Sequence, residues 1–412
     1  MQVLYARCAG LDVHQETVVA CVLVTRPLGK VQRQVRTFRT MTADLVALSK
    51  WLCEQQVEQV AMESTGVFWW PIYNILEEGG HSLLLVNPQH TKALPGRKTD
   101  VKDSEWLADL LRHGLLRGSF IPPATIRELR EVTRYRKTLV QERAQESTRL
   151  QKVLESANIK LAVVATDILG VSGQAMLHAL ADGEDDAAAL ANLARGKLIK
   201  KLDALRAALE GRVKPHHRLL IRAILRHISY LTSTIDHLDA EIAAALAPLE
   251  GTALLLRTIP AIGPTAAAAI LAEIGTDMSR FPSAKHLASW AGLCPGNRQS
   301  GGKRLSGVTT HGNVWLRGIL GEVAWAAIRK KGTSFGARYR RLARRVGKQK
   351  AVVAVMHHLL VVIYQVLATG RPYQELGPDY FRPGDPHRRQ RRLVQGLEAL
   401  GYSVTLAPKD AA

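Results

Sequence analysis

Cysteine is scarce in this chain of 412 residues, which has only four: Cys8, Cys21, Cys53 and Cys294. None of them forms a CxxC pair, and no histidine lies at a zinc-like spacing from any of them. The pattern therefore argues against a structural zinc site. It predicts free thiols, buried in a protein of the reducing cytoplasm.

Long hydrophobic runs are also missing. The N-terminal segment MQVLYARCAGLDVHQE reaches an acid and a histidine before any run of signal-peptide length, so we expect no secretion signal. One apolar stretch, Ala351–Ala368, is nearly long enough to span a bilayer, but His357, His358 and Gln365 interrupt it. We therefore expect a buried helix of an all-α domain here, and no membrane partner.

Acidic side chains are scarce only in the last third of the chain. Residues 251–412 carry 24 basic and 8 acidic side chains, whereas residues 1–120 carry 13 and 12 and residues 121–250 carry 19 and 16. Most of the formal net charge of +20 therefore belongs to the C-terminal third. A basic block of this size predicts a polyanionic partner, most often nucleic acid. The apolar content of 47% excludes a mainly disordered chain.

Residues 1–121 alternate between strand-like and helix-like patterns. Two short strands joined by a polar turn fall in AGLDVHQETVVACVLV, and QVRTFRT is a third candidate. A helical pattern, the strand QVAMES, a second helix and the strand HSLLLVN follow. A β-meander followed by a βαβ unit predicts an α/β domain with a mixed sheet.

The remainder of the chain has mostly helical patterns. We expect a helical or coiled-coil region over residues 122–250 with an insertion at about 160–215, an all-α domain over 251–376 and a basic tail over 377–412. In the first of these regions, apolar residues three and four apart define one seam, as in a coiled coil or a helical hairpin. The seam comprises Leu220, Ile224, Ile228, Leu231, Ile235, Leu238, Ile242 and Leu246.

Four acids of the first domain form a candidate metal site. Asp12 lies in the first strand, Glu63 ends a later strand, and Asp100 and Asp103 open a helix three residues apart. Strand ends at one sheet edge and a nearby helix start can bring all four together, and such oxygen donors suit Mg²⁺. Each acid alone has an ordinary explanation, since acids favour a first helical turn, a β-turn or a polar strand end. The ordered set of four is harder to dismiss.

This order, in the segments GLDVHQE, AMESTG and KTDVKDSEWLADLL, resembles the RuvC-like DEDD domain of a bacterial insertion-sequence transposase family. That family is related to the pilin-gene invertase and is directed by a bridge RNA. The resemblance implies an RNase H-like N-terminal domain, a helical middle and an all-α C-terminal transposase domain. It also implies Mg²⁺ binding, at a site that can hold two ions, by Asp12, Glu63, Asp100 and Asp103.

A serine in the basic region carries the second half of the resemblance. The chain has Trp290-Ala291-Gly292-Leu293-Cys294-Pro295, then Ser300-Gly301-Gly302, then Gly312-Asn313-Val314-Trp315-Leu316-Arg317. A Ser-Gly-Gly turn alone is usually a loop. The family, however, has the same W-x-G-L-x-P, S-G-G and G-N-x-x-L-R pattern, and its serine is the nucleophile for strand cleavage. The resemblance assigns that role to Ser300, with Ser306 as a weaker candidate.

Basic side chains around and after this serine are candidate nucleic-acid contacts. A solvated helix face would also explain these residues, but the charge of the region favours phosphate contact. They are Arg298, Lys303, Arg304, Arg317, Arg338, Arg340, Arg341, Arg344, Arg345, Lys348 and Lys350. Upstream, Thr258–Pro264 resembles a helix-hairpin-helix turn with Ala261 in place of the usual glycine, and a tight turn without DNA contact explains it equally well.

The resemblance therefore implies a transposase or recombinase in which Ser300 attacks a DNA phosphate with the help of bound Mg²⁺. A structured guide RNA would pair with donor and target DNA. Synapsis would require a dimer or tetramer, for which the apolar seam is a candidate surface. The protein would be cytoplasmic, and associated with the nucleoid when bound to DNA. Two alternatives remain at this point: a metal-dependent junction-resolving nuclease that uses water, and a non-catalytic nucleic-acid-binding protein.

Overall fold

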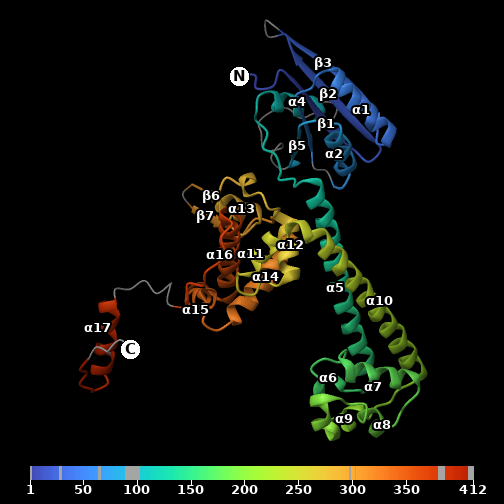
Figure 1. Ribbon diagram of the computed structural model, residues 1–412, viewed down its shortest axis with the longest axis vertical. Helices are drawn as coiled ribbons and strands as arrows, with labels where there is room; N and C mark the ends of the chain where they lie inside the picture. Colours follow the sequence, from blue (N-terminus) through green and yellow to red (C-terminus); the bar gives the residue numbers. More distant parts are fainter. Residues whose placement is uncertain are drawn as a thin grey trace. The chain divides into compact units, whose positions relative to one another are not determined.

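The computed structural model describes residues 2–26, 30–63, 66–88, 103–296, 298–301, 303–378 and 386–406, with only the backbone described at 298–300, 304–306, 386–389 and 392. The chain divides into two compact units, Met1–Ala124 and Thr125–Ala412. Figure 1 shows the sheet and its helices in the first unit and the helices of the second.

The first unit contains a five-stranded mixed sheet in the order β3-β2-β1-β4-β5. The first three strands form an antiparallel meander, and β4 and β5 continue the sheet parallel to β1. This is the strand order of an RNase H-like, RuvC-like domain, so the predicted fold class is confirmed. The strands are β1 (Arg7–Val13), β2 (Thr17–Thr25), β3 (Val31–Arg39), β4 (Gln59–Glu63) and β5 (Leu83–Val86).

Helices cover both faces of the sheet. The two faces of β1 alternate, as strand geometry requires. Ala9, Leu11 and Val13 pack in one apolar core with α1 (Thr42–Glu54) and α2 (Trp69–Glu78). Cys8 packs in the opposite core, with α4 (Asp103–Arg112). Even-numbered positions of β1 therefore face α4.

Two of the four cysteines are buried as expected, and one is not. Cys8 and Cys21 lie in the core beside α4, where burial raises the pKa of each thiol to about 12. Cys294 is half-buried, and burial also raises its pKa. Cys53 is exposed in the last turn of α1, which corrects the expectation of four buried thiols.

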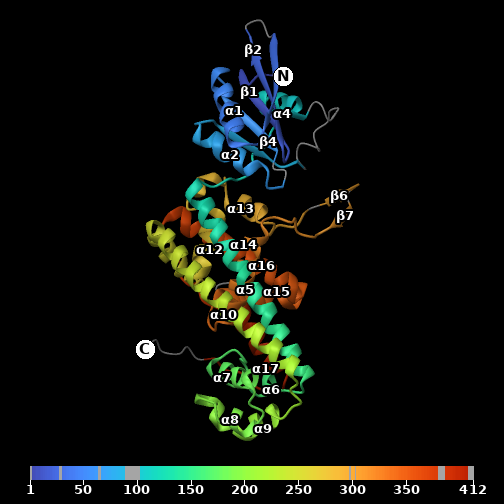
Figure 2. The same ribbon diagram turned by 90° about the vertical axis from the view of Figure 1, so that its right-hand side faces the viewer.

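The second unit begins with two long helices, α5 (Ala124–Ser156) and α10 (Pro215–Leu246), which run side by side (Figures 1 and 2). Leu139 of α5 packs against Leu231 and Ile235 of α10. The predicted seam is therefore occupied within the chain, which corrects its interpretation as a free oligomerisation surface. The seam also shifts at its start, because Leu220 is 44% exposed whereas Ile221 is buried.

The insertion is a small helical bundle that packs against the C-terminal end of α5 and the N-terminal end of α10. It contains α6 (Leu161–Val164), α7 (Val171–Asp182), α8 (Ala187–Ala191), the 3-10 helix η3 (Gly196–Lys201) and α9 (Leu202–Leu209). Its core includes Leu177 and Leu190 together with Leu150 of α5 and Ile221 of α10. This bundle covers the side of α10 that carries Ile221, which explains the shift of the seam.

The C-terminal region is helical apart from one hairpin. Its elements are η4 (Ala247–Leu249), α11 (Glu250–Arg257), α12 (Pro264–Ile274), η5 (Met278–Arg280), α13 (Ala284–Trp290), β6 (Arg298–Ser300), β7 (Lys303–Ser306), α14 (Val314–Arg329), α15 (Ser334–Val346), α16 (Lys348–Thr369) and α17 (Pro386–Glu398). Among the described residues, α16 alone is long and apolar enough to cross a membrane. It packs against α11, α13, α14 and α15 and buries Val355, Leu359 and Ile363, so the expected core helix is confirmed.

Candidate functional site

Two of the four predicted metal ligands lie at the carboxyl ends of neighbouring strands of the sheet. Strands β1 and β4 are parallel neighbours, with Leu11 paired with Met62. Asp12 and Glu63 are the next residues of these two strands. They therefore occupy adjacent positions at the carboxyl ends of β1 and β4.

Both acids also face the same side of the sheet. Asp12 lies on the even-numbered face of β1, two residues after Gly10. Glu63 follows two residues after Ala61, which packs in the core beside α4. Because side chains alternate along a strand, the Asp12 and Glu63 side chains leave the sheet on the side that α4 covers.

Gly10 explains how α4 comes so close to this edge. A Cβ at Gly10 would lie 2.3 Å from the Ser104 carbonyl oxygen and 2.5 Å from the Ala108 nitrogen, so only glycine fits. The C-terminal end of α4 lies near the start of β1, because the nitrogen of Leu4, three residues before β1, donates to the Arg112 carbonyl oxygen at 2.8 Å. The helix thus runs antiparallel to β1, and its first residue, Asp103, lies toward the end of the strand that carries Asp12.

The carboxylates of the described acids suit a divalent metal by their chemistry, and two of them, Asp12 and Glu63, are neighbours in the sheet. Asp12, Glu63 and Asp103 are half-buried, and Asp100 lies outside the described residues. Within the described ranges, no three His, Cys, Asp or Glu side chains already form a compact ligand group. His14, which is not among the predicted site residues, places Nε2 3.2 Å from Asp12 Oδ2. Its position two residues after Asp12, on the same face, is the signal that could have identified it.

The predicted serine lies in a β-hairpin, not in an irregular loop. Strands β6 and β7 pair antiparallel, with Ser300 opposite Lys303 beside the turn and Ser306 opposite Arg298 at the other end. Ser300 is therefore at the tip of the hairpin, which projects from the helical region in Figure 2. The alternative serine, Ser306, is in the half of the hairpin that is nearer the helices.

Two glycines of the motif close the base of this hairpin. Gly292 and Gly312 have φ values of +68° and +53°, a backbone conformation that favours glycine. A Cβ at Gly312 would lie 2.3 Å from the Gly292 nitrogen. Closer to the strands of the hairpin, the Gly296 nitrogen donates to the Val308 carbonyl oxygen at 2.9 Å. These glycines therefore join the two chain segments that lead into and out of the hairpin.

Arg317 contributes to the same base. Its Nη1 donates to the carbonyl oxygens of Thr310 and His311, both at 3.1 Å. The predicted nucleic-acid contact at this position thus has a structural partner in the segment that leaves the hairpin. Lys303 is exposed, while the side chains of Arg298 and Arg304 lie outside the described part.

The predicted basic block forms one strongly charged helix and the start of the next. Arg338 on α15 is half-buried, and burial, with a contribution from Arg341, lowers its pKa. Thr333 caps the helix by accepting from the Gly336 nitrogen at 3.2 Å. The exposed cations are Arg340, Arg341, Arg344, Arg345, Lys348 and Lys350. They are accessible to a polyanion.

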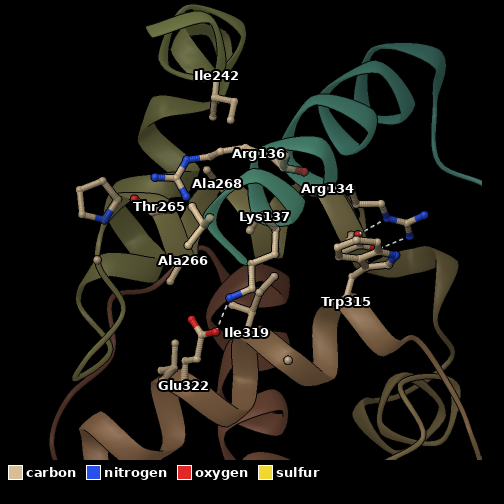
Figure 3. A pocket seen from close by; sticks show the side chains of 18 of the residues that line it. Arg134, Arg136, Lys137, Ile242, Thr265, Ala266, Ala268, Trp315, Ile319 and Glu322 are labelled. Atoms are coloured by element: carbon tan, nitrogen blue, oxygen red, sulfur yellow. Dashed lines mark hydrogen bonds and ion pairs between the residues drawn. The ribbon is translucent and has the colours of Figure 1, made fainter. Parts of the chain in front are cut away.

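The segment between α11 and α12 is a tight interhelical turn. Ala261 has φ +70°, the left-handed conformation that glycine usually adopts in a helix-hairpin-helix. The start of α12 borders a cavity of about 470 Å³ that α5, α10 and α14 also line (Figure 3). Its cations are neutralised, since Arg136 pairs with Asp239 and Lys137 with Glu322. This cavity is largely apolar, and these two cations are already engaged in ion pairs.

Comparisons with known proteins assign both halves of the chain. A transposase family model, the DEDD transposase of the IS110 type, matches residues 9–159. A second model, the transposase IS116/IS110/IS902 family, matches residues 253–340. The two matches together cover more than half of the chain and place a DEDD domain before a transposase domain. The chain belongs to the IS110 family of DEDD transposases.

Individual relatives agree with this assignment. The pilin gene-inverting proteins of Moraxella bovis and Moraxella lacunata are each 33% identical over 154 residues, which are 37% of this chain and 48% of theirs. The chain thus spans about half the length of these curated relatives. A probable family 20 transposase of Pseudomonas aeruginosa is 27% identical over 302 residues, covering 72% of this chain and 79% of its own. Among solved structures, the T. thermophilus RuvC in complex with a Holliday junction substrate matches 27% of this chain and 99% of its own, at 13% identity and a TM-score of 0.21.

Proposed function

We propose that this chain is the transposase of an insertion sequence and that it cuts and rejoins DNA in the bacterial cytoplasm. The observation that carries the proposal is that Asp12 and Glu63 are neighbours at the carboxyl ends of β1 and β4, and that α4, which Gly10 allows to approach, begins with Asp103 toward the same end. Carboxylates in this arrangement suit Mg²⁺. Membership of a DEDD family supports divalent metal use, which we assign to these residues and Asp100.

The proposed chemistry divides between the two units. In the second unit, the Ser300 oxygen bonds to phosphorus, and the bond from phosphorus to the DNA 3′-oxygen breaks. The serine gives up its proton, and the departing oxygen takes one up as a free 3′-hydroxyl. Arg298, Lys303 and Arg304 hold the phosphate beside the hairpin. In the first unit the four acids hold one or two Mg²⁺ ions, which when bound would neutralise charge on the phosphate.

The nucleic-acid partners follow from the charge and from the family resemblance. The exposed cations of α15 contact the phosphates of donor and target DNA, and the net charge of +16 over residues 251–412 supports this. A bridge RNA selects both DNA sites by base pairing, and the protein acts as a dimer or tetramer. The family resemblance supports these two statements.

A denaturing adduct assay with Ser300→Ala tests the proposal. The wild-type chain, with RNA and donor DNA, should form a covalent protein–DNA band in Mg²⁺, and the variant should form none. Ser306→Ala serves as the matched control and should keep the adduct. Asp103→Asn or EDTA should abolish the adduct while leaving DNA affinity largely intact. Cleavage without any adduct would instead establish a nuclease that uses water, and no cleavage of any substrate would establish a binding protein.

A further inference from the structure

A buried acid that the proposed chemistry does not use lies in the last turn of α12. Glu273 is 1% exposed, within an otherwise apolar helix. Arg134 of α5 binds its carboxylate with two hydrogen bonds, Nε to Oε1 at 2.7 Å and Nη2 to Oε2 at 2.8 Å. A buried carboxylate is tolerated only when such partners compensate for its lost hydration.

The same carboxylate holds the start of α14. Asn313 Nδ2 donates to Glu273 Oε2 at 2.6 Å. The other end of the amide, Asn313 Oδ1, accepts from the nitrogens of Trp315 and Leu316 at 3.0 and 2.9 Å and caps the helix. Both ends of the Asn313 side chain are therefore engaged, and its orientation is determined.

A second arginine of α5 strengthens the junction. Arg130 Nε donates to the Ala272 carbonyl oxygen at 3.0 Å, and its Nη2 donates to the Glu273 carbonyl oxygen at 2.7 Å. Burial lowers the pKa of Arg130 to about 10, against the opposing effect of Glu273. The guanidinium of Arg134 also lies over the ring of Trp315, 5.6 Å from its centroid (Figure 3). Three helices, α5, α12 and α14, therefore meet at one carboxylate.

This junction lies directly beside the hairpin that carries the serine. Asn313 follows Gly312, one of the two glycines that close the hairpin base. Through Asn313, Glu273 thus ties the hairpin base to α5, the helix that begins where the first unit ends. We propose that Glu273 is a positioning residue, which orients the Ser300 hairpin relative to α5. The inference rests on the proposed role of Ser300.

A swap of the two polar partners tests this link. In Glu273→Gln, an amide N–H faces either Asn313 Nδ2 or Arg134, so one donor meets another donor. In Asn313→Asp, the cap of α14 is kept, but two carboxylates face each other. The double variant Glu273→Gln/Asn313→Asp restores the hydrogen bond between the two positions with its direction reversed and keeps the net charge of the pair. The amide nitrogen at position 273 then also faces Arg134 Nη2, which donates to the same carboxylate oxygen in the wild type. The double variant should therefore rescue both single variants in part.

The main measurement is the rate of adduct formation at saturating DNA, well below the unfolding temperature. Each single variant should be slower by about tenfold or more, because a hydrogen bond to a charged group is lost and a buried polar group remains unpaired. DNA affinity should not change, and the double variant should form the adduct faster than either single variant but more slowly than wild type. Asp239→Asn is the matched control, since it weakens another pair between α5 and α10, Arg136–Asp239, that does not touch α14.

Hydrogen exchange separates this inference from the proposed function. The Gly296 amide should exchange faster in both single variants than in wild type, and the double variant should reverse this in part. Single variants that lose thermal stability but keep the wild-type adduct rate and Gly296 exchange would overturn the positioning role. If the wild-type chain forms no Ser300-dependent adduct, the proposed function fails and the exchange result alone decides whether Glu273 holds the hairpin.

Discussion

Replacing Gly10 with alanine tests how the acids of the first unit are placed. The added Cβ would lie 2.3 Å from the Ser104 carbonyl oxygen and 2.5 Å from the Ala108 nitrogen. Both are backbone atoms of α4, so neither can rotate away. The helix must move outward by roughly 1 Å to restore van der Waals separation.

The size of the effect follows from that movement. Overpacking of this kind costs about 1–3 kcal/mol, so the free energy of unfolding should fall by about 2 kcal/mol. Because Asp103 is the first residue of α4, the same movement displaces it from Asp12. A misplacement of about 1 Å in a reacting arrangement lowers the rate by about a hundredfold. The loss of activity should therefore exceed what the loss of stability explains.

Two assays separate these effects. Urea denaturation gives the change in stability, and the rate of Mg²⁺-dependent adduct formation by the folded variant gives the change in activity. Gly251→Ala is the control, since it lies in α11, where an added Cβ meets no atom within 4 Å. A Gly10→Ala protein as stable and as active as wild type would refute the close approach of α4 to β1.

Two further predictions concern the C-terminal region. Burial, with smaller contributions from Arg338 and His357, lowers the pKa of His358 from 6.5 to about 4. Between these values the unfolded chain binds a proton that the folded chain does not, so stability should fall as pH is lowered from 6.5 to about 4. The fall measured by urea denaturation should be shallower in His358→Gln, and an equal fall would contradict the assignment. Reversing the charge of Arg344 and Arg345 should weaken DNA binding and reduce its salt dependence, whereas an unchanged slope of log affinity against log salt would show that neither touches phosphate.

The sheet was predictable because its signals are local. Alternating apolar residues in AGLDVHQETVVACVLV predict the first two strands, and the structure has them as β1 and β2, with the polar turn at residues 14–16 between them. The positions of Asp12 and Glu63 at strand ends follow from the same pattern. The sequence predicts a helix start at Asp100 and Asp103, and α4 begins at Asp103. Local periodicity is sufficient when one face of each element is buried.

The remaining features depend on contacts between distant residues. The seam of α10 begins at Ile221 instead of Leu220 because the inserted bundle covers that side of the helix, and no pattern within α10 shows this. Glu273 pairs with Arg134, 139 residues away. One signal was present, since Glu273 is the single acid in the apolar segment PTAAAAILAEI. A lone charged residue in such a segment indicates that a polar or oppositely charged partner is buried with it, but the sequence does not show which residue that partner is.

Helix α5 is the element through which the two proposed halves of the active site are connected along the chain. It begins at Ala124, where the unit that carries the acids ends, and its Arg130 and Arg134 hold the end of α12 beside the base of the serine hairpin. A change in the orientation of α5 would therefore reach the hairpin through Glu273 and Asn313. Arg134, Glu273 and Asn313 all belong to the second unit of one chain, so every protomer contains the whole link. The positioning role of Glu273 is thus independent of how the protomers assemble.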